Sequence, residues 1–391
     1  TRIALVKRIL VGLILGAILG IAVPQATGIA ILGDVFVSAL KAIAPLLVFF
    51  LVISSLCNAG KSHGGVIKTV IILYMFSTVL AAVIAVFASM AFPVKMTLAN
   101  AATDTSAPQG IVEVLNNLLL NVVANPVSSL VNANYVGILM WAVLLGLAFR
   151  VADKMTKKVL ADVADGISMV VTWIINLAPF GIFGLVFNTV STNGLDIFTT
   201  YGKLLLLLVG CMLFIYFVTN PLLVYWCIRQ NPYPLIFQCL KRSALTAFFT
   251  RSSAANIPVN MKVCEEMGLD RDTYSVTIPL GATINMDGAA ITITVMTMAT
   301  AFTLGIHVDI PTAIILSLLA ALSACGASGV AGGSLLLIPM ACSLFGISDD
   351  ITMQVVAVGF IIGVVQDSVE TALNSSSDLL LSASAEFRQW R

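Results

Sequence analysis

Long apolar runs alternate with short polar segments along most of the chain. Eight runs reach the roughly 20 residues that a helix needs to cross a bilayer; they cover residues 9–31, 35–57, 66–92, 113–150, 163–190, 201–228, 272–304 and 351–384. We expect the longest run to break at Pro126. Membrane β-barrel strands have about 10 residues of alternating polarity, a pattern that these runs lack. The chain is therefore predicted to be an all-α polytopic membrane protein with eight transmembrane helices.

Two further segments are apolar but are interrupted by polar or glycine-rich tips. Residues 233–267 have their tip at Thr250–Asn256, and residues 311–346 have theirs at Cys325–Ser334. Irregular backbone at membrane depth is tolerated only where protein buries it or where it lines a cavity. We therefore expect two re-entrant helical hairpins rather than two kinked core helices.

Composition agrees with a membrane protein. Hydrophobic residues make up 59% of the chain, charged residues 10%, and the mean hydropathy is +1.04, whereas soluble domains carry about 25% charged residues. The net charge of +1 gives no sign of nucleic-acid binding. The seven cysteines lack metal-ligand spacing, so neither a disulfide nor a zinc site is indicated. The start at Thr1 suggests a trimmed N-terminus.

The positions of the 20 Lys and Arg residues predict the orientation, because cytoplasmic loops are enriched in them. A cytoplasmic N-terminus leaves only Lys95 and Lys203 outside, with Lys41 and Arg251 at membrane depth, and it places both termini inside. The two hairpins then enter from opposite sides. Each is followed by a span that carries an Asn and an Asp, which indicates inverted repeats around a transport site.

Four carboxylates lie inside apolar stretches: Asp287, Asp367, Glu370 and Asp378. A carboxylate at this depth is costly, so it is expected to face a cavity, an ion or a partner charge. Helical spacing places one polar stripe on the last span, formed by Asp367, Glu370, Thr371, Asn374 and Asp378. Carboxylates attract an ammonium group or a hard cation such as Na⁺, and hairpin tips offer free N–H groups to a substrate carboxylate. The stripe therefore suits an amino acid and a small cation.

The motifs at these positions resemble the dicarboxylate/amino acid:cation symporter family, the glutamate-transporter-like elevators. The resemblance covers essentially the whole chain and rests on four motifs in order: Thr250–Pro258, Asn285–Gly288, Gly326–Gly333, and Asn374 with Asp378. The strings Arg251–Asn260 and Gln366–Asn374 are similar to the sodium-coupled serine/threonine subgroup.

The resemblance implies roles for individual residues. Asp367 would receive the substrate amino group, and Asn374 would hold the substrate carboxylate together with backbone of the hairpin tips. The implied substrate set is Ser252, Ser253, Gly329, Val330, Asp367, Glu370, Thr371 and Asn374. The implied Na⁺ set is Tyr74, Ser77, Thr78, Thr283, Asn285, Asp287, Ala324, Cys325, Ala327, Asn374 and Asp378.

Two departures from the family pattern affect the substrate and the number of ions. Members that take acidic substrates have an Arg where this chain has Glu370, and the first tip reads Ser-Ser-Ala-Ala where others are richer in Ser. Because two adjacent buried carboxylates repel each other, we expect Arg251 to pair with one of them. The pocket would then be near neutral and would favour a small hydroxyl amino acid.

The resemblance also implies an organisation and a location. Residues 1–65 and 113–200 would form a scaffold of helices 1–2 and 4–5, and residues 66–112 and 201–391 a mobile transport unit. The assembly would be a homotrimer in a bacterial inner membrane, surrounded by lipid, with an elevator-type alternating-access mechanism.

The expected function is Na⁺-driven uptake of serine and threonine. The alternative within transport is a Na⁺- or H⁺-coupled symporter of acidic amino acids or dicarboxylates, which needs a spare cation, and only Lys41 and Arg251 lie at membrane depth. An intramembrane aspartyl hydrolase would need two acids that share a proton, and a passive channel is disfavoured by the hairpin tips expected to close both faces. We therefore expect a transporter rather than an enzyme.

Overall fold

The computed structural model describes residues 5–58, 65–98, 120, 123–132, 134–195, 197–325 and 332–388. Its regular elements in these ranges are helices. The first part of the chain forms α1 (Leu5–Ala22), α2 (Ala30–Asn58), α3 (Gly65–Ala91), α5 (Pro126–Val131), α6 (Tyr135–Ala148), α7 (Lys154–Asn176) and α8 (Ala178–Asn193), with 3₁₀ turns at Thr27–Ile29 and Phe149–Val151.

The second part contains a long helix interrupted by a π turn, then two helical hairpins that alternate with long helices. Its elements are α9 (Ile197–Phe214), the π turn Ile215–Thr219, α10 (Asn220–Ile228), α11 (Tyr233–Cys239), the π turn Leu240–Ala244, α12 (Leu245–Thr250), α13 (Ser253–Glu266), α14 (Arg271–Ile284), α15 (Asp287–Thr303), α16 (Ile310–Ala324), the 3₁₀ helix Gly333–Leu337, α17 (Ile338–Ser343) and α18 (Asp349–Phe387).

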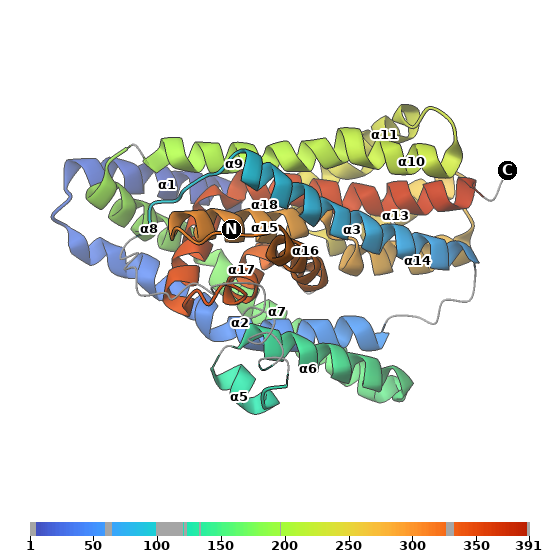
Figure 1. Ribbon diagram of the computed structural model, residues 1–391, viewed down its shortest axis with the longest axis horizontal. Coiled ribbons are helices and arrows are strands. Elements are labelled where there is room, and N and C mark those ends of the chain that lie inside the picture. The colour runs from blue at the N-terminus through green and yellow to red at the C-terminus, as the bar shows by residue number, and fades with distance from the viewer. Residues whose placement is uncertain are drawn as a thin grey trace.

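The helices pack as two groups. In one, α1 packs on α8, and α2 packs on α6, α7 and α8. In the other, α15 packs on α3, α16 and α18, while α12, α13 and α14 also contact α18 (Figure 1). In Figure 1, α2 and α6 lie along the lower edge, α9 and α10 along the upper edge, and α15 and α18 run between them.

Glycines allow the close contact between α1 and α8. A Cβ at Gly16 would lie 2.6 Å from the carbonyl oxygen of Phe183 and 3.2 Å from the amide nitrogen of Phe187. A Cβ at Gly12 would lie still closer to the carbonyl oxygen of Pro179. Small residues at four-residue spacing let membrane helices approach backbone to backbone. Gly12, Gly16 and Gly20 have this spacing, so sequence and packing agree here.

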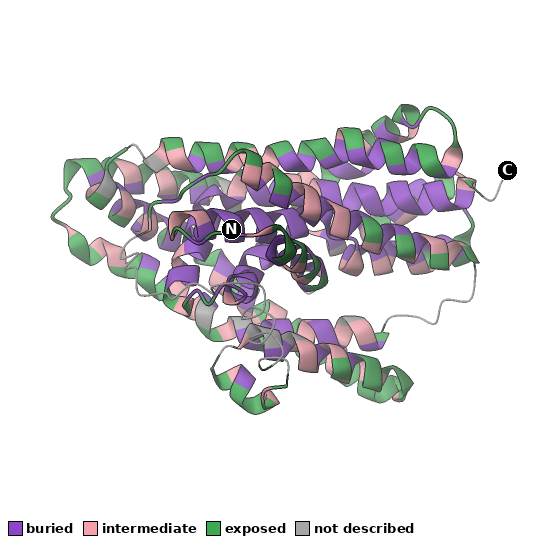
Figure 2. Ribbon diagram, viewed as in Figure 1, coloured by how far each residue is buried: buried purple, intermediate pink, exposed green. Residues whose placement is uncertain are grey.

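The two long polar helices form the interior of the second group. Every residue from Asp287 to Ala301 in α15 is buried, as is most of α18, which Figure 2 shows as nearly continuous purple ribbons. The outer helix α9 shows many exposed residues instead, and the exposed side chains of α6 and α9 include apolar ones such as Leu144 and Leu206. A bilayer surrounds such a surface favourably, so this is the pattern of a multi-pass membrane protein.

Six helices of the described residues are long and apolar enough to cross a membrane: Thr27–Asn58, Gly65–Ala91, Lys154–Asn176, Phe198–Ile228, Arg271–Thr303 and Asp349–Phe387. The single span expected at 163–190 is wrong, because α7 ends at Asn176 and α8 begins at Ala178 with Pro179 in its first turn. The predicted run 113–150 contains α5 and α6, and α5 begins at Pro126. The total of eight spans stays a prediction.

The reversal predicted at the first tip is present. Helix α12 ends at Thr250, Arg251 has a left-handed backbone (φ +50°), and Ser252 caps α13 by accepting a hydrogen bond from the amide of Ala255 at 3.2 Å. At the second tip, α16 ends at Ala324 and the 3₁₀ helix starts at Gly333. Residues 326–331 between them lie outside the described residues.

Candidate functional site

The four carboxylates singled out from the sequence are all buried. Asp287 begins α15, and Asp367, Glu370 and Asp378 lie on α18; their exposed fractions are 0, 5, 5 and 1%. The five residues of the predicted stripe therefore lie on one unbroken helix. The helix pair α14 and α15 is interrupted at Asn285 and Met286, which brings the Asn-Met-Asp-Gly motif to the middle of the bundle, against α18.

Asp287 is held by α3. Its Oδ2 accepts a hydrogen bond from the Ser77 hydroxyl at 2.7 Å, and its Oδ1 accepts one from the Thr78 hydroxyl at 3.2 Å. The Thr78 oxygen also accepts the backbone N–H of Met286 at 3.2 Å. The helix break is thus held against α3 by two hydroxyl groups that belong, with Asp287, to the Na⁺ set implied by the resemblance.

Asp378 is held by Asn285 and Tyr74. The Asn285 amide donates to Asp378 Oδ1 at 2.9 Å and to the Ser377 hydroxyl at 2.7 Å, while the Tyr74 hydroxyl donates to the backbone carbonyl of Asp378 at 2.8 Å. The side-chain oxygen of Asn285 is buried without a hydrogen-bond partner. This leaves an acceptor oxygen close to a carboxylate, as a hard cation requires.

No lysine or arginine of the described ranges forms an ion pair with Asp287 or Asp378. A buried carboxylate without a compensating charge is strongly unfavourable. The close approach of α14 is also specific to glycine, since a Cβ at Gly281 would lie 2.8 Å from Asp378 Oδ1 and 2.9 Å from the Tyr74 hydroxyl. The environment of Asp287 and Asp378 is therefore one that would suit carboxylates binding a cation.

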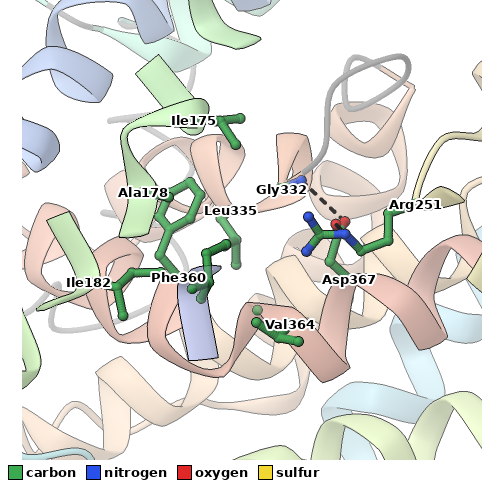
Figure 3. A pocket seen from close by; sticks show the side chains of 11 residues that line it. Ile175, Ala178, Ile182, Arg251, Gly332, Leu335, Phe360, Val364 and Asp367 are labelled. Atoms are coloured by element: carbon green, nitrogen blue, oxygen red, sulfur yellow. Dashed lines mark hydrogen bonds and ion pairs between the residues drawn. The ribbon is translucent and has the colours of Figure 1, made fainter. Parts of the chain in front are cut away.

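Asp367 lies between the two hairpins. Its Oδ1 accepts the backbone N–H of Gly332 at 3.2 Å, and its Oδ2 lies 3.6 Å from Nε of Arg251 at the first tip. The structure thus places Arg251, the expected charge partner, beside Asp367 and not beside Glu370. Figure 3 shows these contacts at one side of a small cavity, whose other side is apolar and includes Ile175, Ala178, Ile182, Leu335, Phe360 and Val364.

Glu370 has three neutral hydrogen-bond donors. Its Oε2 accepts from Thr292 at 2.7 Å, from Ser334 at 2.8 Å and from Gln366 at 2.5 Å. No described lysine or arginine pairs with it. Glu370 is thus a buried acid surrounded by neutral hydrogen-bond donors.

Asn374 connects α18 to the helix break. Its Oδ1 accepts the backbone N–H of Gly288 at 2.7 Å, and its amide contacts the sulfur of Met286 at 3.4 Å. Thr371, one helical turn before Asn374, is also buried on the stripe. The carboxylate-binding role inferred for Asn374 would require this hydrogen bond to be shared or exchanged.

The remaining predicted residues are more scattered. Ser253 is buried at the first tip, Thr283 bonds its own helix through the Leu280 carbonyl at 2.7 Å, and Ala324 is buried at the end of α16. The Cys325 sulfur lies 4.0 Å from the Ile284 carbonyl, so the end of α16 lies next to the break between α14 and α15. Ala327, Gly329 and Val330 lie outside the described residues.

The structure also shows polar residues that the sequence reasoning did not assign. Thr292, Ser334 and Gln366 surround Glu370; of these, only Gln366 is adjacent in sequence to a predicted residue. A second network joins the first hairpin to α18. Its members are Ser243, Asn256, Asn260 and Ser375, with Asn256 donating to Ser375 at 2.7 Å and Asn260 donating to the Ser375 carbonyl at 2.8 Å. Two Asn residues four apart in an apolar hairpin were the available signal.

Comparison with known proteins agrees with this geometry. The profile of the sodium:dicarboxylate symporter family matches residues 5–386. The chain belongs to this family. The resemblance predicted from the four motifs is thus confirmed, and so is the expectation of a transporter rather than an enzyme.

Several similar proteins of the family are named serine/threonine transporter SstT. One from Bifidobacterium adolescentis is 59% identical over 388 residues, covering 99% of this chain and 90% of the relative. One from Streptococcus thermophilus is 56% identical over 391 residues, covering 100% and 97%. One from Streptococcus agalactiae is 58% identical over 386 residues, covering 98% and 96%.

Proposed function

We propose that the protein couples the entry of Na⁺ to the uptake of serine, threonine and similar small neutral amino acids. The names of the similar proteins and the family description support this proposal. The observation that carries the choice of a neutral substrate is Glu370, a buried acid one helical turn from Asp367. A substrate with its own side-chain carboxylate would meet repulsion there, and no lysine or arginine of the described residues pairs with Glu370 to offset it.

Two parts of the site are proposed to hold Na⁺ as a co-substrate. Asn285 and Asp378 offer an unpartnered amide oxygen and a carboxylate, and Asp287 with Ser77 and Thr78 offers a carboxylate and two hydroxyls. Oxygen ligands of this kind suit a hard cation. Carbonyls near Thr283, Ala324, Cys325 and Ala327 complete the proposal for a further ion at the helix break.

The substrate is proposed to bind between the hairpin tips. Asp367 would receive the ammonium group, exchanging its contact with Arg251, and the amides of the tips with Asn374 would hold the carboxylate. The substrate hydroxyl would lie on the side of Thr371 and Glu370, where donors and acceptors are concentrated. A site that hydrogen-bonds a hydroxyl discriminates strongly against analogues without one.

We propose an elevator mechanism from the division into two packing groups. Helices α1, α2, α6, α7 and α8 would form the scaffold, and α3 with the helices from α9 onward would form the transport unit. The small cavity in Figure 3 lies where the two groups meet, and its scaffold side is apolar. An apolar surface of this kind permits sliding. The homotrimer and cytoplasmic termini belong to the same proposal.

The alternative substrate class, acidic amino acids or dicarboxylates, is supported less well. It needs a cation for the second carboxylate, and Arg251 is already beside Asp367 at 3.6 Å. With the substrate ammonium group on Asp367, Arg251 could pair with the second carboxylate of an acidic substrate, but Glu370 has only neutral partners and would still repel that carboxylate. The neutral substrate is therefore preferred on electrostatic grounds.

Uptake into liposomes tests the proposal. Purified protein should accumulate labelled serine only under an inward Na⁺ gradient, and excess unlabelled serine or threonine should compete. Equally strong competition by aspartate or glutamate would replace the neutral substrate by the acidic alternative. Equilibration without accumulation would indicate a channel and would overturn the proposal as a whole.

A further inference from the structure

A separate groove lies between α3 and α9, away from the polar site. Its volume of about 840 Å³ is within the range of roughly 300–1,000 Å³ typical of small-molecule sites. The lining is almost entirely apolar and includes Phe87, Phe92, Leu206, Gly210 and Phe214. Phe92 and Leu206 are 69 and 73% exposed, so the groove is open to the surroundings of the helix bundle.

Two lysines mark one end of this groove. Lys203 lines it, and Lys95 directly follows Val94, which also lines it. These are the two basic residues that the charge pattern places on the outer side. Both are exposed, and neither ammonium group forms an ion pair with an acidic side chain in the ranges that the structure describes. The groove thus has a long apolar wall, and basic residues lie at or beside one of its ends.

We propose that this groove binds an anionic phospholipid, with an acyl chain along the apolar wall and the phosphate between Lys95 and Lys203. The apolar wall alone would accept any chain, but ammonium groups on Lys203, in the lining, and on Lys95, next to the lining residue Val94, would favour a negative headgroup by charge complementarity. The long lysine side chains can lie along the groove and keep their charges at the headgroup level. Because α3 also carries Ser77 and Thr78, the lipid contacts a helix that contributes to the polar site.

Gly210 offers a direct test of the apolar wall. A Cβ at Gly210 meets no atom within 4 Å, so Gly210→Leu fills the groove without a clash. Gly202, on the same helix, also has open space and does not line the groove, so Gly202→Leu is the matched control. Native mass spectrometry of the full-length protein should show loss of bound phosphatidylglycerol from Gly210→Leu and retention by Gly202→Leu.

The lysines test the headgroup. Replacing Lys95 and Lys203 by Ala should weaken phosphatidylglycerol binding by roughly fivefold for each lysine and leave phosphatidylcholine binding unchanged. Lys154→Ala with Lys158→Ala, exposed on α7, is the control pair.

Three outcomes would overturn the proposal: equal retention of both lipids by the native protein, equal loss in the control variants, or a change of oligomeric mass in Gly210→Leu with unchanged lipid binding. The last would make the groove a contact between copies of the chain.

Discussion

The pair α15 and α18 and the pair α1 and α8 are both closely packed, but with opposite chemistry. Between α1 and α8 the contact depends on glycines that let backbones approach, and α1 has only apolar residues and glycines from Ile9 to its end at Ala22. Helices α15 and α18 together carry the four buried acids singled out from the sequence, and Glu370 of α18 accepts hydrogen bonds from Thr292 of α15 and from Gln366 of its own helix. The first arrangement serves rigidity, whereas the second retains groups that a folded core would otherwise exclude. Substitutions should separate these two roles.

Loss of the Asp378 charge should have the largest effect. In Asp378→Asn, a dehydrated Na⁺ would lose the negative charge that balances it; removal of one partner of a buried charge pair typically costs 3–5 kcal/mol. We expect Na⁺ affinity to fall by more than about a hundredfold and Na⁺-driven uptake to disappear. Asp153→Asn, at an exposed helix N-cap, is the control. Unchanged Na⁺ affinity in Asp378→Asn would remove Asp378 from the ion site.

Gly281→Ala should have the next largest effect. The new Cβ would lie 2.8 Å from Asp378 Oδ1 and 2.9 Å from the Tyr74 hydroxyl, so both oxygens must shift. Overpacking of this kind costs about 1–3 kcal/mol, and we expect Na⁺ affinity to weaken by roughly tenfold or more. Gly166→Ala, where a Cβ meets open space, is the control. Equal Na⁺ affinities of the two variants would show that α14 does not shape the site.

Gly16→Leu should affect the other region only. Its side chain would meet the Phe183 carbonyl, already 2.6 Å from the Cβ position, and separate α1 from α8. The free energy of unfolding should fall by about 1–3 kcal/mol, and the thermal unfolding temperature should fall with it. The folded protein should keep its Na⁺ affinity within about twofold. Gly28→Leu, at a position with open space, is the control. A loss of Na⁺ affinity parallel to the loss of stability would erase the distinction between the regions.

The smallest effect is expected at the base of the first hairpin, where Arg242 pairs with Glu266. The hydrogen bond from Arg242 lowers the pKa of Glu266 below its usual range. The pair therefore contributes stability above the unfolded pKa of about 4.3, and this contribution is lost as pH falls through the folded value. Glu266→Gln should unfold at a slightly lower temperature at pH 7 and at the native temperature near pH 3. Glu265→Gln, its exposed neighbour, should show no difference at either pH.

Sequence periodicity predicted the buried polar helix α18 because its polar residues repeat on one face. Asp367, Glu370, Asn374 and Asp378 lie on a single continuous helix, as their spacing required. The hairpin reversal at Arg251 was also predictable, since a polar tip inside an apolar segment has few alternatives.

Partners that come from distant parts of the chain were not predictable in the same way. Thr292 and Ser334 reach Glu370 from two other elements, and only the tertiary packing brings them together. The end of α7 at Asn176 was missed because apolar residues continue across it, so the hydropathy pattern shows no boundary. Pro179, two residues into α8, was the local signal.

Serine affinity measured by calorimetry at increasing Na⁺ concentration tests the central claim most directly. If the buried oxygens of Asn285, Asp287 and Asp378 hold the co-transported ion, serine should bind purified protein in Na⁺ and show no measurable heat in K⁺ at equal ionic strength. Its affinity should increase steeply as Na⁺ rises. Equal serine affinity in Na⁺ and K⁺ would contradict the account.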